Sequence, residues 1–381
     1  MAAKIVNLKP KQRSFDEPVQ FSFWEIDDRR LTNTIALWDV APRGVFRHSD
    51  DLRDGKSLRL IQRSFVYAGG VYKVILTPAR FVSGSGDVEK YPGEREQLVE
   101  EVIRQIAVQR NRLALQGDKG DVGVSFTIYE VQKELERTGH AFSHVEIVEA
   151  LNILHMSRVE IIRLVDDGSG KPKERVVSGT TFPMLVWANR SSAEAQTTVS
   201  FNWLVSQALM ALSFRQMDYE TLMRMPGPIE RWLYRAINHD VFFSRNNQPL
   251  HIMLATEIID GCGMTRRKRL RDSLRRVSEA LAWLKTEGLI ADFTTRDILD
   301  GQRKVDVEYT VTPTQSLADQ MAKSNQIAED NMVQFRAITG TEPGVAVPND
   351  PEKRLKLRRL KTQRVADGSG KIKSLKEDAV G

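Results

Sequence analysis

Seven basic side chains lie within residues 265–276, and the chemistry they could perform is the binding of anions. They stand against a single acid, Asp272, and they are Arg266, Arg267, Lys268, Arg269, Arg271, Arg275 and Arg276. A guanidinium group binds phosphate, and in the major groove of DNA it can donate two hydrogen bonds to guanine. The run indicates a contact with nucleic acid. A solvated basic face on an ordinary core helix is the alternative that remains open.

The same stretch has the pattern of an amphipathic helix. Leu270, Leu274, Val277, Leu281 and Leu284 recur at steps of four and three residues, which places them on one stripe. Thr265 is a good N-cap and Gly288 a good residue to follow the last turn. Cations in a first helical turn oppose the helix dipole, so we expect a polyanion near that end.

Catalytic motifs are weak by comparison. Gly-Ser-Gly-Lys occurs at 168–171 and 368–371, but the glycine and the hydroxyl residue that a phosphate-binding loop also needs are absent from both copies. His140 and His144 have no third metal ligand nearby, and Cys262 between two glycines fits a small turn residue. We therefore expect a binding protein without catalytic activity, metal or cofactor.

Charge is concentrated in two places. The 381-residue chain has a net charge of +6 and a pI near 9.3, with 41% hydrophobic residues. Residues 265–276 and 351–381 each carry +6, which leaves −6 for the remainder. One cysteine, no apolar run near the ~18 residues of a membrane span and no apolar signal segment predict a cytoplasmic protein without a membrane partner.

The order of elements predicts an α+β protein with two tandem winged helices. In the first, helix 93–111 and strand Val122–Phe126 precede two helices with capping boxes, Thr127 to Glu130 and Ser143 to Glu146, and then two strands, Val159–Val165 and Arg175–Trp187. In the second, the predicted elements are helix Pro228–His239, strand Pro249–Leu254, helix Ala255–Asp260, the turn Gly261–Gly263, the basic helix, and strands Leu289–Thr295 and Lys304–Val311 around the loop Arg296–Gln302.

The predicted domains follow from this order. They are a disordered segment at 1–30, a β-rich extension at 31–90 with a hairpin turn at 68–70, the two winged helices at 91–213 and 214–312, and a basic, largely disordered tail at 313–381 that is helical in part before 350. The second helix of the first winged helix carries Glu146 and Glu149 and no arginine or lysine, so we expect it to serve packing, dimerisation or backbone positioning.

Three runs of sequence resemble plasmid replication initiators of the TrfA and RepA type. Residues 124–162 resemble their first winged helix, 214–240 with the basic helix the start of their second, and 37–46 (LWDVAPRGVF) their N-terminal region. The resemblance implies binding to direct repeats (iterons) in double-stranded origin DNA, opening of an AT-rich segment and recruitment of the host replicative helicase and host initiator. It also implies a monomer–dimer equilibrium in which dimers repress their own promoter.

A cluster of aromatic residues near the N-terminus has two readings. Gln20, Ser22, Phe23 and Trp24 are similar to the sliding-clamp motif of some initiators, with Phe and Trp replacing its Leu and Phe. A strand that docks on the body is the other reading.

These observations lead to one hypothesis with assigned residues. Arg266 and Arg267 would reach base edges, because recognition helices enter the groove N-terminus first. Further DNA contacts would come from Thr265, which also caps the helix, and from Lys268, Arg269, Arg271, Arg275 and Arg276. From the wing, Arg296, Arg303 and Lys304 would bind phosphate. The alternatives are a tandem winged-helix transcriptional repressor without a replication role, and an interaction scaffold whose basic helix binds an acidic protein.

Overall fold

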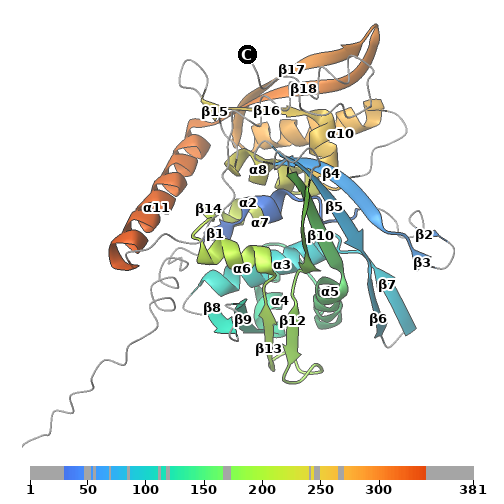
Figure 1. Cartoon of the computed structure of the whole chain (residues 1–381), viewed down its shortest axis with the longest axis vertical. Helices are drawn as coiled ribbons and strands as arrows, with labels where there is room; N and C mark the ends of the chain where they lie inside the picture. The colour runs from blue at the N-terminus through green and yellow to red at the C-terminus, as the bar shows by residue number, and fades with distance from the viewer. Residues whose placement is uncertain are drawn as a thin grey trace, which may run out of the picture.

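Two hydrophobic cores organise the chain, one for each predicted winged helix (Figure 1). The first core draws mainly on residues between Ile35 and Met223, and the second on residues between Met217 and Met321. The computed structural model describes residues 30–46, 53–54, 57–67, 70–83, 86–109, 113–116, 121–165, 173–239, 242–243, 249–264 and 270–339.

The first module has the helices that the sequence predicts. They are α3 (Glu94–Val108), α4 (Ile128–Arg137) and α5 (His144–Met156), with strand β9 (Asp121–Thr127) before α4. Both capping boxes form: the amide of Glu130 donates to the Thr127 hydroxyl at 3.1 Å, and the amide of Glu146 donates to the Ser143 hydroxyl at 3.3 Å. Local side-chain chemistry therefore sets where these two helices begin.

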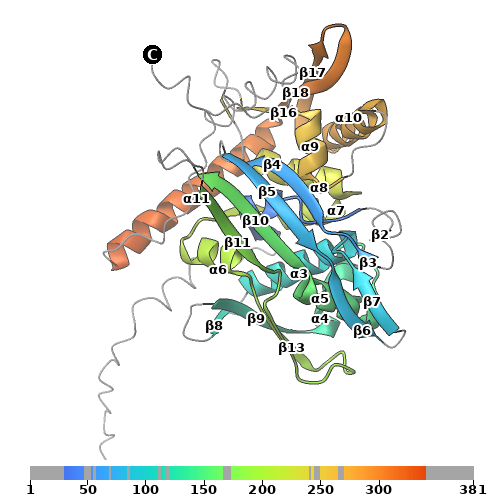
Figure 2. The same ribbon diagram turned by 45° about the vertical axis from the view of Figure 1, so that its right-hand side comes forward.

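The N-terminal strands complete the sheet of the first module. Strands β4 (Ile61–Tyr67) and β5 (Gly70–Thr77) form the predicted hairpin, with Tyr67 opposite Gly70. Strand β5 also pairs with β10 (Arg158–Val165), which pairs with β11 (Lys173–Thr180), in the order β11-β10-β5-β4 (Figure 2). The small hairpins β2 (Arg53–Asp54) with β3 (Ser57–Leu58) and β6 (Ala79–Ser83) with β7 (Gly86–Lys90) lie beside this sheet.

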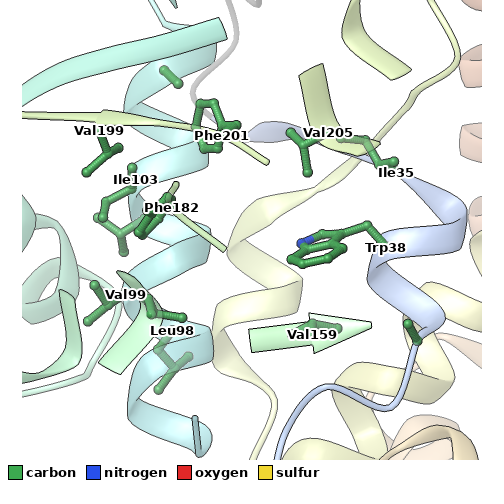
Figure 3. Packing of buried hydrophobic residues seen from close by; sticks show 14 of the residues in the cluster. Ile35, Trp38, Leu98, Val99, Ile103, Val159, Phe182, Val199, Phe201 and Val205 are labelled. Carbon is green, nitrogen blue, oxygen red and sulfur yellow. The ribbon is translucent and has the colours of Figure 1, made fainter. Parts of the chain in front are cut away.

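One strand prediction is wrong in the first module. Residues 175–187 were expected to be one strand, but they divide into β11 and β12 (Met184–Trp187), which belong to different sheets. Phe182 is fully buried at the bend and lies beside Phe201 and Ile103 (Figure 3), and Pro183 has no amide to donate to a ladder. Strand β12 joins β13 (Gln196–Ser200), β9 and β8 (Leu113–Gln116) in a second sheet.

The predicted β-rich extension also contains a short helix. Leu31–Thr34 forms β1, which pairs with β14 (Arg215–Asp218), and Ala36–Val40 is helix α2. The carboxylate of Asp39 accepts the backbone amide of Ile35 at 2.6 Å, which satisfies a donor at the start of this short helix. Helices α6 (Trp203–Met210) and α7 (Tyr219–Arg224) complete the first module and the connection to the second.

The second module is a winged helix whose elements match the sequence closely. Helix α8 (Pro228–His239) and strand β16 (Pro249–Leu254) have the predicted bounds, and α9 (Ala255–Gly261), α10 (Leu270–Thr286), β17 (Ile290–Asp300) and β18 (Arg303–Pro313) follow. The sheet order is β15-β16-β18-β17, with β15 at Phe242–Phe243. The expected loop Arg296–Gln302 is wrong, because Arg296 pairs with Glu308 inside the ladder and only Gly301 and Gln302 separate the strands.

Helix α11 (Gln315–Thr339) lies in the stretch that was expected to be helical in part, and it packs along β14 (Figures 1 and 2). Leu317 and Met321 are buried in the second core, whereas Phe335 is buried in the first. The hydroxyl of Ser324 accepts the backbone amide of Gln216 at 2.9 Å. The helix thus connects both modules. Residues 340–381 lie outside the described residues.

Buried charges join the two modules through the N-terminal segment. Arg104 of α3 donates to the Asp39 carboxylate at 2.6 and 3.1 Å, and to the carbonyl of Asn33 at 2.8 Å. Arg235 of α8 donates to Glu101 of α3, which also lies 3.5 Å from Arg104. These four ionic side chains are at most 7% exposed. One network therefore holds the first helix of each winged helix against α2.

Two further ion pairs extend this network. Glu100 of α3 accepts the indole N–H of Trp38 at 2.7 Å and the guanidinium of Arg43 at 2.9 Å. Arg231 of α8 is buried and donates to Glu94 at the start of α3. Burial alone would raise the pKa of Asp39, but the charge and hydrogen bonds of Arg104 outweigh it and hold that pKa well below its usual range.

We predict that Arg104→Ala lowers the free energy of unfolding by about 3–5 kcal/mol, because it leaves Asp39 and Glu101 buried with less compensation. Denaturant titration measures this loss. Arg80→Ala is the control, since Arg80 pairs with Glu89 at 2.6 Å with 64% of its side chain exposed, and a loss under ~1 kcal/mol is expected.

The stability that ionised Asp39 contributes is present above its unfolded pKa of ~3.9 and is lost as pH falls below it. The difference between wild type and Arg104→Ala should therefore narrow from pH 7 to pH 3. A difference that is constant with pH would contradict the assigned role of Asp39.

Candidate nucleic-acid interface

Helix α10 buries one stripe and exposes the opposite face. Val277, Leu281 and Leu284 are fully buried and Leu274 is partly buried, as the spacing predicts. The helix ends at Thr286, and Gly288 follows with a φ of +71°, the left-handed conformation that glycine adopts most readily. The amide of Leu289 donates back to the carbonyl of Leu284 at 3.0 Å. The apolar stripe and the C-terminal glycine are both confirmed.

The exposed face carries three arginines that have little or no ionic compensation. Arg271, Arg275 and Arg276 are all exposed. Arg275 lies 3.6 Å from Glu279, with 65% and 59% of the two side chains exposed, so this pair contributes little. Arg271 and Arg276 form no ion pair within the described part of the chain. This face is therefore free to bind phosphate.

The N-terminal part of the basic run cannot be placed. Thr265, Arg266, Arg267, Lys268 and Arg269 lie outside the described residues. The helix cap at Thr265, the base contacts of Arg266 and Arg267 and the further contacts of Lys268 and Arg269 stay predictions. The described helix begins at Leu270, directly after this segment.

The turn before α10 is well packed. Cys262 is 5% exposed, and burial raises the pKa of its thiol to about 12, so the thiol is neutral at physiological pH. This state suits a small structural residue. Gly263 follows with a φ of +81°. The chain thus reverses tightly between α9 and the basic run.

Side chains that the sequence did not single out hold the wing against α9 and α10. Asp306 of β18 is 3% exposed and accepts both the amide and the hydroxyl of Thr256 at the start of α9. The hydroxyls of Ser278 on α10 and Tyr309 on β18 lie 2.9 Å apart. These contacts make α9, α10 and the wing one packed unit. The only sign of them in the sequence is an acidic residue, Asp306, within an otherwise apolar part of the wing strand.

The wing itself is acidic. Residues 290–313 contain three basic residues, Arg296, Arg303 and Lys304, and five acidic ones, for a net charge of −2. Arg296 donates two hydrogen bonds to Glu308, at 3.0 and 2.9 Å, and Lys304 lies 2.6 Å from Asp297. Arg303 is exposed and forms no ion pair with a described residue. Of the three predicted wing contacts, Arg303 has the most available charge.

Helix α5 of the first module is different from α10. Glu146 is engaged in its capping box, and Glu149 accepts Lys90 at 2.7 Å and Arg95 at 2.8 Å. Val145 on its exposed side is 73% accessible. The helix presents no uncommitted arginine or lysine, which is consistent with the expected packing or positioning role.

The remaining motifs are accounted for separately. His140 contacts the carbonyl of Met223 at 2.9 Å, which is a contact between α7 and the turn after α4. Gln20, Ser22, Phe23 and Trp24 lie outside the described residues, so the clamp motif and the docked strand both stay predictions. Across the described ranges, no helix is long and apolar enough to cross a bilayer, and no cluster of three potential metal ligands is present.

The chain is similar to three solved structures. The selenomethionine derivative of domains 2 and 3 of RctB has 11% identity and a TM-score of 0.42, covering 72% of this chain and 99% of that chain. Another crystal structure of RctB domains 2–3 has 10% identity and a TM-score of 0.41, with coverage of 76% and 99%. The Pi initiator protein in complex with iteron DNA has 11% identity and a TM-score of 0.39, with coverage of 58% and 91%.

No family model matches the chain, and no curated protein matches it.

Proposed function

We propose that this protein binds double-stranded DNA sequence-specifically through α10 and initiates plasmid replication from direct repeats in an origin. The observation that carries the proposal is the exposed, poorly compensated arginine face of α10 (Arg271, Arg275 and Arg276). In a winged helix, the helix after the turn is the element that enters the major groove. Here that helix follows α9 and the turn at Cys262 and Gly263.

The distribution of charge supports a single mode of approach. DNA would meet the basic helix, while the wing offers Arg303 as its one uncommitted cation in the described residues and carries a net negative charge. Phosphate contacts position a protein on the duplex, and contacts to base edges specify the sequence. The described arginines fit the positioning role, and the unplaced Arg266 and Arg267 are proposed to read bases.

The buried network between α3 and α8 supports binding as one rigid unit. The network fixes the first module relative to the second. A DNA repeat of defined length therefore fits the two modules better than a short isolated DNA site does. Opening of an AT-rich segment and recruitment of the host helicase, the host initiator and the sliding clamp belong to the same proposal. Conversion between monomers and dimers belongs to it as well.

We predict that wild-type protein will select one sequence from a random duplex pool, and that Arg271→Ala/Arg276→Ala will weaken its binding at least about tenfold. Each lost phosphate contact should reduce the slope of log K against log salt by about 0.9. Lys323→Ala on α11 removes an exposed cation away from α10 and should leave binding unchanged. Equal affinity of the double variant and wild type would exclude α10 as the DNA-binding element.

We predict that the three wing cations will differ in their effect on affinity. Arg303→Ala should weaken binding more than Arg296→Ala or Lys304→Ala, because the latter two side chains are already neutralised by Glu308 and Asp297. Glu308→Gln should strengthen binding by releasing Arg296. These affinities can be compared by fluorescence anisotropy on one duplex. Equal losses for all three alanine variants would show that the ion pairs open on DNA.

We predict that the gene with its flanking DNA will sustain replication of a circle that lacks any other origin. The Arg271→Ala/Arg276→Ala protein should fail to do so, and colony counts under selection measure the difference. If the wild type binds a single promoter palindrome and the circle is lost, the protein is a repressor instead.

A further inference from the structure

The turn that leads into the basic helix is held by residues of the first module. Gly263 lies so close to the N-terminal segment that a Cβ at this position would be 2.5 Å from the carbonyl oxygen of Gly44 and 2.9 Å from Nη1 of Arg63. The same nitrogen of Arg63 donates to the carbonyls of Pro42 and Gly44, at 2.9 and 2.6 Å. This close approach of Gly44 and Arg63 to Gly263 is named the turn clamp.

The first-module side of the turn clamp is anchored. Arg43 donates to the carbonyl of Trp38 at 2.9 Å, and its guanidinium lies 3.9 Å from the ring centroid of Trp38 and pairs with Glu100. The amide of Val45 donates to the carbonyl of Pro92 at 2.8 Å. Arg63 itself belongs to β4, the edge strand of the four-stranded sheet, which pairs with β5 along its length. The segment that meets Gly263 therefore has little freedom to move.

The second-module side is equally close-packed. A Cβ at Gly261, the last residue of α9, would lie 2.2 Å from the ring of Trp232. The indole N–H of Trp232 donates to the carbonyl of Val40 at 3.1 Å. Residues 261–263 are therefore enclosed by α8 on one side and by Gly44 and Arg63 on the other.

We propose that the turn clamp makes Arg63 a positioning residue for DNA recognition, so that the first module sets the placement of α10 in the groove. This inference rests on the proposed function. Hydrogen bonds to base edges depend on fixed geometry, whereas phosphate contacts depend mainly on charge. Disruption of the turn clamp should therefore reduce discrimination between DNA sequences and leave the affinity for non-specific DNA nearly unchanged.

The two glycines that flank α10 provide a matched test. Gly263 and Gly288 both have positive φ, so Gly→Ala introduces backbone strain at either position. Only Gly263 meets neighbouring atoms, because a Cβ at Gly288 has nothing within 4 Å. The affinity ratio between the selected duplex and a scrambled duplex should fall about tenfold or more in Gly263→Ala and less than about threefold in Gly288→Ala.

Substitutions of Arg63 provide a second test if Gly263→Ala fails to fold. Since one nitrogen donates to both carbonyls, the ammonium of Arg63→Lys can replace it, and Arg63→Ala cannot. Arg63→Ala should lower the affinity ratio about tenfold, and Arg63→Lys should restore most of it. Wild type, Arg63→Ala and Arg63→Lys should bind the scrambled duplex with the same affinity and with the same slope of log K against log salt.

Hydrogen exchange of the free protein separates failure of this inference from failure of the proposed function. The amides of residues 262–264 should exchange faster in Arg63→Ala than in wild type or Arg63→Lys. If the wild-type protein does not discriminate between the selected and scrambled duplexes, the proposed function is wrong. The exchange rates of residues 262–264 still show whether Arg63 holds the turn. An unchanged affinity ratio in both Gly263→Ala and Arg63→Ala, with wild type discriminating, overturns the inference.

Discussion

The structure depends on ionic side chains that are buried between the two winged helices. Arg104, Asp39, Glu101 and Arg235 are removed from water, which is costly unless each charge meets its partner in good geometry. An apolar interface could slide by a fraction of a helical turn and still bury the same area. A network of charges cannot, because a shift would separate Arg235 from Glu101 while both remain buried. We infer that this interface contributes a defined orientation more than it contributes stability.

That orientation decides how the rest of the molecule can meet a long, regular ligand. Two contacts place the second module against the N-terminal segment: Gly263 meets Gly44, and the indole N–H of Trp232 donates to the carbonyl of Val40. Helix α11 then connects the two cores at Leu317 and Phe335. Because these contacts come from separate elements, the turn after α9, α8 and α11, a rotation of one module would have to break several of them together. The two winged helices therefore behave as one body with a fixed spacing.

Local features were predictable from the sequence, and contacts distant along the chain were not. The bounds of α8 and β16, both capping boxes and the apolar stripe of α10 follow from patterns within a few residues. The pairing of β5 with β10 joins residues more than 80 positions apart, and no local pattern encodes it. Helix α3 forms where the sequence predicts it, but no local pattern indicated that Glu100, Glu101 and Arg104 are buried. Their partners come from α2 and α8, far away along the chain.

The candidate site shows the same division, and it explains why the two winged helices differ. The arginines of α10 could be identified from the sequence, and among the described residues only Arg275 has an acidic partner, the exposed Glu279. Around α5, Lys90 and Arg95 both form ion pairs with Glu149, which partly neutralises their charge. Val145 on the exposed side is apolar and cannot attract phosphate. A module whose second helix carries no arginine or lysine can still contribute to recognition if it controls geometry. The turn clamp gives the first module that control, because Arg63 and Gly44 lie against Gly263, two residues before the basic run. In this arrangement one module supplies the charge and the other supplies its placement.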